Sequence, residues 1–303
     1  RLVEAVRPEA RLILVGDPGQ LASIEAGVVL DDIVGAGTGP GSNPGIVVLD
    51  RVHRYGGAIA RLADAIRAGN GDGAVRALGA APGEVTWLAV DAHDPEADLG
   101  LVRERAVATG VKLTEAAREG EARDALAALT RFRVLCAHRR GPYGVSDWTS
   151  RVQGWLSGEL ADLDVDQRDF VGRPLLVTQN DYELGLWNGD AGVIVQRAGE
   201  RPVAVFERGE QLLRFSPLRL GSVETVYAMT VHKSQGSQYD TAAVLLPAVS
   251  SRLLTRELLY TAVTRAREEL ILVATEEAVR AAVARPVARA SGLRERLWGA
   301  PES

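Results

Sequence analysis

The chain has 303 residues, of which 46% are hydrophobic and 25% charged, and its formal net charge at pH 7 is −5. These proportions are ordinary for a soluble globular protein, and no apolar run approaches the roughly 18 residues needed to cross a bilayer. The negative charge argues against nucleic-acid binding through a general basic field but leaves room for a local groove. The single cysteine, Cys136, excludes an internal disulfide framework, fits a reducing cytoplasm and is interpreted as a small buried residue.

The first residues, from Arg1, have the apolar spacing of the end of a helix whose beginning is missing. We therefore expect the chain to be a C-terminal piece of a longer protein. The apolar run 11–15 predicts a central strand. The segment from Gly16 to Leu21, Gly-Asp-Pro-Gly-Gln-Leu, then predicts a tight turn into a helix. By itself this turn is only a structural feature.

A glycine-rich segment, 35–45, follows and is expected to be an exposed, mobile loop. After a short strand predicted at 46–49, apolar residues spaced i, i+3, i+4 and i+7 indicate an amphipathic helix that stops at a glycine. These positions are Ile59, Leu62, Ala63 and Ile66, with Gly69 as the stop. On spacing alone, Arg54 would be a solvated arginine near the start of this helix.

The stretch 71–131 is rich in alanine, glutamate and arginine and gives the fewest clues. Its pattern predicts two helices, at about 97–109 and 114–129. A strand follows at 132–136, and the basic residues after it would lie at the ligand edge of a parallel sheet, where they could contact phosphates. These residues are His138, Arg139 and Arg140.

A further helix is expected to start at Ser146 or Asp147, both of which can cap a helix. It carries an apolar stripe that is better explained as core than as a platform for stacking bases. The stripe consists of Trp148, Val152, Trp155 and Leu156.

The next part reads as a small antiparallel β unit inserted into the α/β pattern. Short strands are predicted at about 175–179, 193–197, 202–207 and 211–215, and Asn188-Gly189 is a strong hairpin signal. A buried strand is then predicted at 226–231, followed by strands at 242–246 and 270–274 with a helix at 255–265 between them. The remainder to about 297 is expected to be helical.

Four stretches resemble motifs of superfamily 1 DNA helicases of the RecD type. Ala228–Asp240 (Ala-Met-Thr-Val-His-Lys-Ser-Gln-Gly-Ser-Gln-Tyr-Asp) resembles motif V, and Arg256–Arg267 resembles motif VI at the expected distance. Gly16–Leu21 resembles motif III, and Arg51–Tyr55 resembles motif IV. The Asn-Gly-Asp-x-Gly element at Asn188 is similar to the entry of the SH3-like insert that precedes motif V in this family.

The resemblance implies an α/β, RecA-like P-loop NTPase fold with a small SH3-like antiparallel insert. Residues 1–45 would end a first RecA-like domain that contains motif III. Residues 46–170 and 223–303 would form the second RecA-like domain, interrupted by the insert at 171–222. ATP would lie between the two domains.

The resemblance also assigns residues to ATP. Gln20 would sense the γ-phosphate, Arg54 would contact the phosphates, and Arg265 would be the arginine finger. Arg267 and Arg256 have a weaker claim, since Arg256 could simply pair with Glu257 or cap a helix. Further residues expected to border the nucleotide are Gly16, Asp17, Gly236 and Gln238. The family usually has Glu at the position of Gln238, so we expect a weaker contact with the ribose.

Single-stranded DNA is the partner that the resemblance implies, with translocation from 5′ to 3′ and RecB-like and RecC-like subunits in a helicase–nuclease that acts in double-strand-break repair. Hydroxyl and ammonium groups of motif V suit phosphate contacts that carry no sequence information. The residues expected to contact DNA are Thr230, His232, Lys233, Ser234 and Asn188.

The sequence has no Gly-x-x-x-x-Gly-Lys-Ser/Thr loop and no Asp-Glu motif before residue 11. We therefore expect the phosphate cradle and the Mg²⁺ ligands that serve ATP to lie upstream, and the chain alone to be inactive. Three alternatives remain open: a stand-alone RecD-like helicase, a helicase-derived DNA-binding module of a relaxase-type protein, and a binding module made of the β insert.

Overall fold

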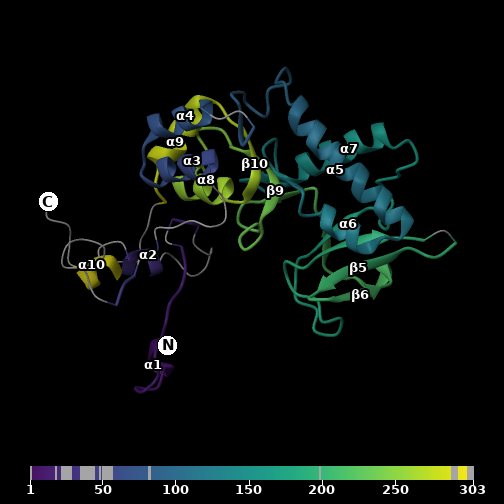
Figure 1. Cartoon of the computed structure of the whole chain (residues 1–303), viewed down its shortest axis with the longest axis horizontal. Helices are drawn as coiled ribbons and strands as arrows, with labels where there is room; N and C mark the ends of the chain where they lie inside the picture. The colour runs from purple at the N-terminus through teal and green to yellow at the C-terminus, as the bar shows by residue number, and fades with distance from the viewer. Residues whose placement is uncertain are drawn as a thin grey trace. The chain divides into compact units, whose positions relative to one another are not determined.

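The computed structural model describes residues 2–17, 19–21, 29–34, 45–47, 49, 57–80, 83–197, 199–287 and 293–298 (Figure 1). The chain divides into two compact units, one of Arg1–Arg51 with Val287–Ser303 and one of Val52–Pro286. Arg54, Tyr55 and most of the glycine-rich segment 35–45 lie outside the described residues.

The described residues of the first unit include three short helices, α1 (Leu2–Ala5), α2 (Val29–Val34) and α10 (Leu293–Trp298). The helical expectation for the first residues is confirmed, but the strand expected at 11–15 does not form. Ile13 and Val15 are 71% and 91% exposed. A buried parallel strand needs hydrogen-bonded neighbours on the sheet. No described strand pairs with 11–15.

The second unit is built on a parallel five-stranded sheet that lies between two layers of helices (Figure 1). Helices α3, α4, α8 and α9 lie on one side of β9 and β10, and α5 and α7 lie on the other. All neighbouring strands are parallel, so their carboxyl ends share one edge. In spatial order the strands are β1 (Val85–Leu88), β10 (Ala266–Val273), β9 (Tyr239–Leu245), β2 (Phe132–Cys136) and β8 (Ala228–Thr230). The strand expected at 226–231 is thus shorter than predicted, although all six residues are buried.

The amphipathic helix predicted from its spacing is α3 (Gly57–Arg67), and its four predicted apolar positions are buried. Gly69, with φ of 68°, ends it in a left-handed conformation that glycine adopts without strain. Gly69 N donates to Ile66 O and Asn70 N donates to Ala65 O, which is the Schellman arrangement. Three more helices complete this layer: α4 (Gly71–Gly79), α8 (Arg256–Val263) and α9 (Glu276–Ala284).

On the other side, two helices form in the stretch predicted as helices at 97–109 and 114–129, but the break between them lies at 120–121 rather than at 110–113. One helix, α5 (Gly100–Glu119), runs through the predicted gap. A Cβ at Gly110 would lie 2.5 Å from a methyl carbon of Leu156, so the glycine permits close packing rather than a break. The second helix of this layer, α7 (Val145–Glu159), begins after Gly144 with no side-chain cap, so neither Ser146 nor Asp147 is the cap.

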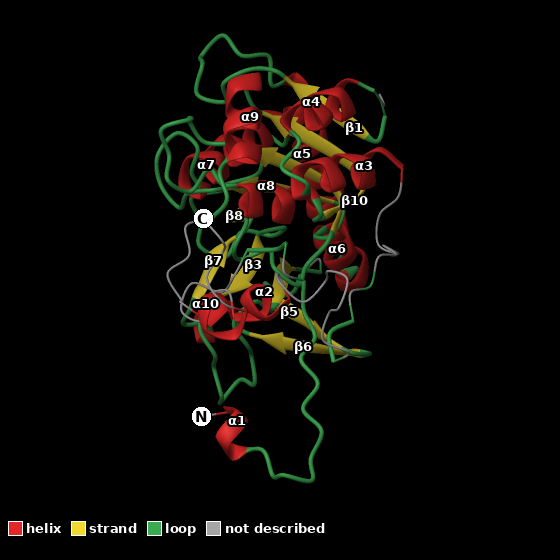
Figure 2. Cartoon of the chain, turned by 90° about the vertical axis from the view of Figure 1, so that its left-hand side faces the viewer, coloured by secondary structure: helices red, strands yellow, loops and turns green. Residues whose placement is uncertain are grey.

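An antiparallel five-stranded sheet confirms the β insert. Figure 2 shows its strands β3, β5, β6 and β7 below the parallel sheet and its helices. The order is β6 (Gln211–Phe215), β5 (Val203–Arg208), β4 (Ala191–Val195), β3 (Pro174–Val177) and β7 (Val223–Thr225), with α6 (Ala122–Ala128) packed beside β4 and a 3-10 turn, η1, at Pro217–Arg219. The antiparallel pairing therefore continues to Thr225.

Among the described helices, none combines the length and the apolarity required to cross a membrane.

Candidate functional site

The segment 231–238 runs from the side of the parallel sheet where its strands end, the carboxyl edge, to the side where they begin, the amino edge. It starts where β8 ends, at the carboxyl edge, and finishes where β9 begins, at the amino edge. Lys233 therefore lies at the carboxyl edge, whereas Gln238 lies at the amino edge beside the start of β10. Open α/β sheets usually place ligands at the carboxyl edge. Within this segment, the residues predicted for DNA and those predicted for nucleotide lie toward opposite edges.

Arg265 lies at the amino edge between α8 and the segment 231–238. It is 3% exposed, and its Nε donates to Thr261 O at 2.9 Å. Its Nη2 donates to Thr264 Oγ1 at 3.1 Å and its Nη1 to Ser237 O at 3.2 Å. These contacts fix the guanidinium before any ligand arrives, which lowers the cost of placing it on a phosphate.

Gln238 lies beside Arg265 and presents a buried amide. Its Oε1 lies 3.5 Å from Arg267 Nε, and Arg267 Nη1 lies 3.8 Å from Asp240 Oδ1. Among the described residues no group accepts a hydrogen bond from the buried Gln238 Nε2. An unsatisfied buried donor costs about 1–3 kcal/mol. The amide must turn outward to donate to an acceptor atom of a ligand, such as a ribose hydroxyl oxygen. Gly236, with φ of 86°, gives the preceding turn its left-handed conformation.

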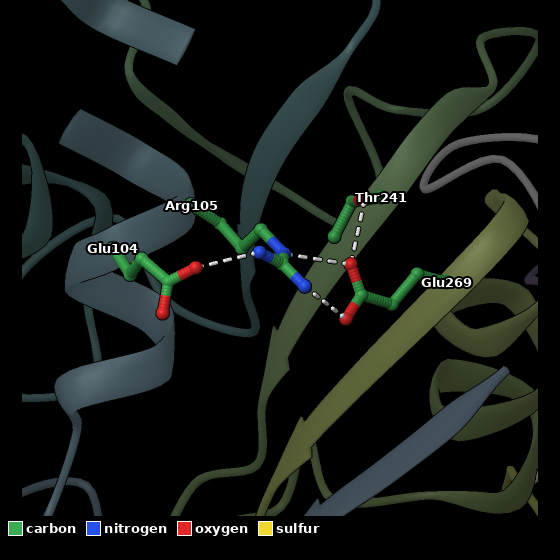
Figure 3. A network of polar contacts seen from close by, with 4 residues as sticks. All are labelled: Glu104, Arg105, Thr241 and Glu269. Carbon is green, nitrogen blue, oxygen red and sulfur yellow. Dashed lines mark hydrogen bonds and ion pairs between the residues drawn. The ribbon is translucent and has the colours of Figure 1, made fainter. Parts of the chain in front are cut away.

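A clamp from α5 holds the start of β10 (Figure 3). Arg105 binds Glu269 with two hydrogen bonds, Nε to Oε2 at 2.9 Å and Nη2 to Oε1 at 3.2 Å, and Thr241 Oγ1 donates to the same carboxylate at 3.1 Å. The hydrogen bond to Glu269 raises the pKa of Arg105 above its usual value. The pairing of β10 with β9 shifts between Ala266 and Glu269. Such bulges redirect side chains near active sites, and here the bulge contains Arg267.

At the carboxyl edge, two hydroxyl groups shape the loop after β8. Thr230 Oγ1 accepts from Lys233 N at 3.2 Å, and Ser234 Oγ donates to Val231 O at 2.7 Å. Thr230 is 8% exposed and Ser234 0%. The two side chains thus bond to their own loop in this structure. Their direct contact with DNA stays a prediction, and their geometry suits positioning Lys233.

Lys233 and His232 are partly exposed in this loop. Lys233 Nζ forms an ion pair of 2.9 Å with Glu224 Oε2 on β7 of the insert. Burial lowers the pKa of His232 below its usual value of 6.5, so the ring is neutral at pH 7. The loop therefore presents one charged and one neutral donor, with the charge held by the insert.

The neighbouring loop after β2 adds basic groups to the same edge. His138 Nε2 lies 3.1 Å from Ser251 Oγ, in the loop after β9. Arg139 and Arg140 are exposed. Their contact with phosphates remains a prediction. Asn188 is exposed on the connection between β3 and β4, where its backbone N donates to Asn180 Oδ1 at 2.9 Å.

Other residues that the sequence singled out have structural roles. Trp148, Val152 and Leu156 are core residues, as predicted. Cys136 is fully buried, and burial raises the pKa of its thiol. Arg256 Nε donates to Val283 O at 2.8 Å, so it caps the end of α9.

In the first unit, the predicted turn is organised by Asp17. Its Oδ1 accepts from Gly19 N at 3.0 Å and its Oδ2 from Gln20 Nε2 at 2.8 Å. A Cβ at Gly16 would lie 2.5 Å from Leu30 Cδ2 of α2, so a larger residue there would displace this methyl group. Within the described residues, no three His, Cys, Asp or Glu side chains are grouped so that they could hold a metal ion.

Sequence reasoning missed Glu224 and Glu269, although both hold cations in the site. Each pairs with a cation in another element, so no local spacing in the sequence predicts either ion pair. Only the bidentate match of an arginine with a carboxylate, visible once α5 and β10 are packed, identifies Glu269.

Comparison with known proteins supplies the family. The UvrD-like helicase C-terminal domain matches residues 225–273 and an AAA domain matches residues 1–90. The protein named RecBCD enzyme subunit RecD from Mycolicibacterium smegmatis is 49% identical over 98% of this chain and 51% of its own length. The ATP-dependent RecD2 DNA helicase of Deinococcus radiodurans is 28% identical over 98% of this chain and 37% of its own.

A more distant relative is the conjugal transfer protein TraA of Rhizobium radiobacter, which is 28% identical over 88% of this chain and 22% of its own length. The chain spans about half the length of the RecD protein of Mycolicibacterium smegmatis. With motifs V and VI on one parallel sheet, an antiparallel insert before them and this degree of identity, the chain is similar along almost its whole length to the RecD proteins, of which it spans about half.

Proposed function

We propose that the chain is part of an ATP-dependent DNA helicase that moves from 5′ to 3′ on single-stranded DNA. The observation that carries the proposal is the segment 231–238, which has Lys233 at the carboxyl edge and Gln238 at the amino edge. Its Ser237 O accepts from Arg265 Nη1 at 3.2 Å. One short segment thereby joins the groups suited to DNA phosphates to those suited to a nucleotide.

The amino-edge residues fit ATP because they supply a fixed guanidinium and a buried amide donor without a partner. ATP supplies the free energy by transfer of its γ-phosphoryl group to water. Arg265 neutralises charge on that group, Arg54 contacts the phosphates, and Gln20 reports the γ-phosphate. Gly16 and Asp17 form the turn that carries Gln20, while Gly236 and Gln238 border the nucleotide. Mg²⁺ would be held by residues other than these.

At the carboxyl edge, the ammonium of Lys233 binds a phosphate of the single strand, and His232 lies beside it. Thr230 and Ser234 hold the loop in shape through their internal hydrogen bonds. The contact of Arg265 with Ser237 O places the guanidinium on the same short segment that carries Lys233, so a nucleotide bound at Arg265 and DNA bound at Lys233 would both act on 231–238.

The assembly that we favour is a RecBCD-type helicase–nuclease, with RecB-like and RecC-like partner subunits and a role in double-strand-break repair. The support is that the relative named as a RecBCD subunit is 49% identical, against 28% for both the RecD2 helicase and the TraA protein. A stand-alone helicase is the second candidate, because the RecD2 relative matches 98% of this chain. Co-purification of the full-length protein with partner subunits separates the two.

We further propose that 1–45 ends a first RecA-like domain and that 46–170 and 223–303 form the second, with the insert at 171–222. The 303 residues alone are expected to hydrolyse ATP at a negligible rate, because the sequence contains no phosphate-binding Gly-x-x-x-x-Gly-Lys-Ser/Thr loop. Measurable ATP hydrolysis by the isolated 303 residues that depends on Arg265 would contradict this expected inactivity.

Strand polarity tests the proposed activity. The full-length protein should unwind a duplex that carries a 5′ single-stranded tail and leave one with a 3′ tail intact. Arg265→Ala should abolish unwinding, whereas Arg201→Ala, on an exposed arginine of the insert, should not change it. Equal unwinding of the two substrates, or full unwinding by the Arg265→Ala variant, would refute the proposal.

A further inference from the structure

The connection between β3 and β4, residues 178–190, carries two aromatic side chains at the surface. Tyr182 is 79% exposed and Trp187 is 42% exposed. They are the only aromatic members of the exposed large hydrophobic side chains among the described residues. Their rings meet edge to face, with centroids 5.5 Å apart and planes at 78°. One ring therefore supports the other, and much of the Tyr182 ring stays open to solvent.

This connection is held rigid by its own carboxylates. Asp181 Oδ1 accepts from Glu183 N and Leu184 N at 3.1 and 3.0 Å, and Asp190 Oδ2 accepts from Trp187 N at 2.8 Å. Asp181 and Leu186 exchange two backbone hydrogen bonds. Because the loop is already ordered, placing a ligand against Tyr182 costs little conformational entropy.

An open groove of about 370 Å³ lies beside the aromatic pair. Its wall includes Tyr182 and the side chains of Gln179, Asn180 and Ser222. Ser222 Oγ donates to Gln179 Oε1 at 3.4 Å, and Asn188 N donates to Asn180 Oδ1 at 2.9 Å. A flat aromatic surface next to amide and hydroxyl groups suits a nucleobase, which stacks with its face and forms hydrogen bonds at its edge.

The groove and the ion pair lie on opposite faces of β7. Val223 lines the groove, whereas the next residue, Glu224, points to the other face of the strand and forms the ion pair with Lys233. The groove is partly acidic, since Asp181 and Glu183 line it. Phosphates are repelled from these carboxylates and attracted to Lys233. A strand whose backbone is bound at Lys233 would thus pass around β7 before one of its bases enters the groove.

We propose that Tyr182, supported by Trp187, stacks an unpaired base of single-stranded DNA and extends the DNA path from Lys233 onto the insert. This inference rests on the proposed function, because it needs a single strand at Lys233. Stacking on a tyrosine tolerates every base, so the contact adds affinity without sequence preference.

The test measures binding of the full-length protein to a labelled oligothymidylate by fluorescence anisotropy. Tyr182→Ala should weaken binding by roughly tenfold, and Tyr182→Phe, which keeps the ring, should stay within about twofold of the wild type. Leu218→Ala is the matched control, because Leu218 is 88% exposed on the same insert but does not line the groove. Unchanged melting temperatures of the variants show that the loss is not one of folding.

Abasic sites placed one at a time along the oligonucleotide locate the stacked base. One position should weaken wild-type binding as much as Tyr182→Ala does, and the variant should lose no further affinity there. If Tyr182→Ala and Trp187→Ala bind like the wild type while Lys233→Ala binds weakly, the stacking inference is wrong and the proposed function stands. If the wild type itself does not bind single strands, the proposed function fails. Loss of partner subunits with normal DNA binding would make the groove a protein interface and overturn the inference.

Discussion

The guanidinium of Arg265 donates through Nη1 to the backbone oxygen of Ser237 at 3.2 Å, so the end of α8 is attached to the segment that begins beside Lys233. The acceptor is a backbone oxygen, so the contact survives most side-chain changes in the segment 231–238. It gives the two edges of the parallel sheet a mechanical connection only a few residues long.

Removing the charge of Glu269 should loosen the start of β10. Glu269→Gln leaves Arg105 without its bidentate partner, and we expect a loss of about 1 kcal/mol in the free energy of unfolding, since the pair is only partly exposed. Because the bulge contains Arg267, the KM for ATP should rise as well. Urea unfolding and steady-state kinetics measure both effects. Glu268→Gln, on an exposed neighbour, is the control, and equal behaviour of the two variants would show that the clamp does not matter.

Releasing Lys233 from Glu224 should strengthen DNA binding. In the wild type, Lys233 must leave its ion pair with Glu224 before it binds a phosphate. Glu224→Gln removes this cost, and an exposed ion pair of this kind contributes about 0.2–1 kcal/mol. The affinity for single strands should therefore rise by up to about fivefold at low salt. Glu207→Gln, which breaks another ion pair of the insert, should have no effect. If the gain persists in a Lys233→Ala background, it does not arise from this ion pair.

His232 should make DNA binding depend on pH. Burial lowers its pKa below 6.5, so the ring gains charge only as the pH falls through that lowered value. A nearby phosphate favours the charged ring, so single-strand affinity should increase between pH 7 and about pH 5. The unfolded chain takes up the same proton at higher pH, so His232 lowers folding stability as the pH falls below 6.5.

His232→Asn should remove both trends relative to the wild type, whereas His138→Asn, in the neighbouring loop, should retain them. Anisotropy titrations and thermal melts over this pH range measure the two effects. The same pH dependence in His232→Asn as in the wild type would assign it to another group.

The buried amide of Gln238 should contribute to nucleotide affinity. Gln238→Ala removes a donor that has no partner among the described residues, and we expect KM for ATP to rise about tenfold with little change in kcat. Gln238→Glu restores the acid usual in the family and should bind ATP at least as tightly as the wild type. With 2′,3′-dideoxy-ATP the wild type and Gln238→Ala should behave alike. A difference that persists with this nucleotide would exclude a contact to the ribose hydroxyls.

Much of the second unit could be predicted because its signals are local. The apolar spacing of Ile59, Leu62 and Ile66 marks α3, and a glycine ends it. The helix break expected near Gly110 was wrong because a glycine can also serve close packing, which only the position of Leu156 reveals. The strand expected at 11–15 failed because a parallel strand depends on neighbours rather than on its own residues.

In the candidate site, too, the sequence predicts local features but not the contacts between elements. Motif resemblance pointed to Arg265, Gln238 and Lys233, and each lies in a cluster of polar contacts. It could not reveal that Ser234 is fully buried or that Glu224 holds Lys233, because both depend on how the loop packs beside β7.

The most direct test of the account is the steady-state rate of ATP hydrolysis by the full-length protein, with and without single-stranded DNA, for the wild type, Arg265→Ala and Lys233→Ala. We predict strong stimulation by DNA in the wild type and a loss on the order of 10³ or more in kcat for Arg265→Ala. For Lys233→Ala we predict normal basal turnover with weakened stimulation. Stimulated turnover in Arg265→Ala that equals that of the wild type would contradict the central claim that this arginine completes the nucleotide site.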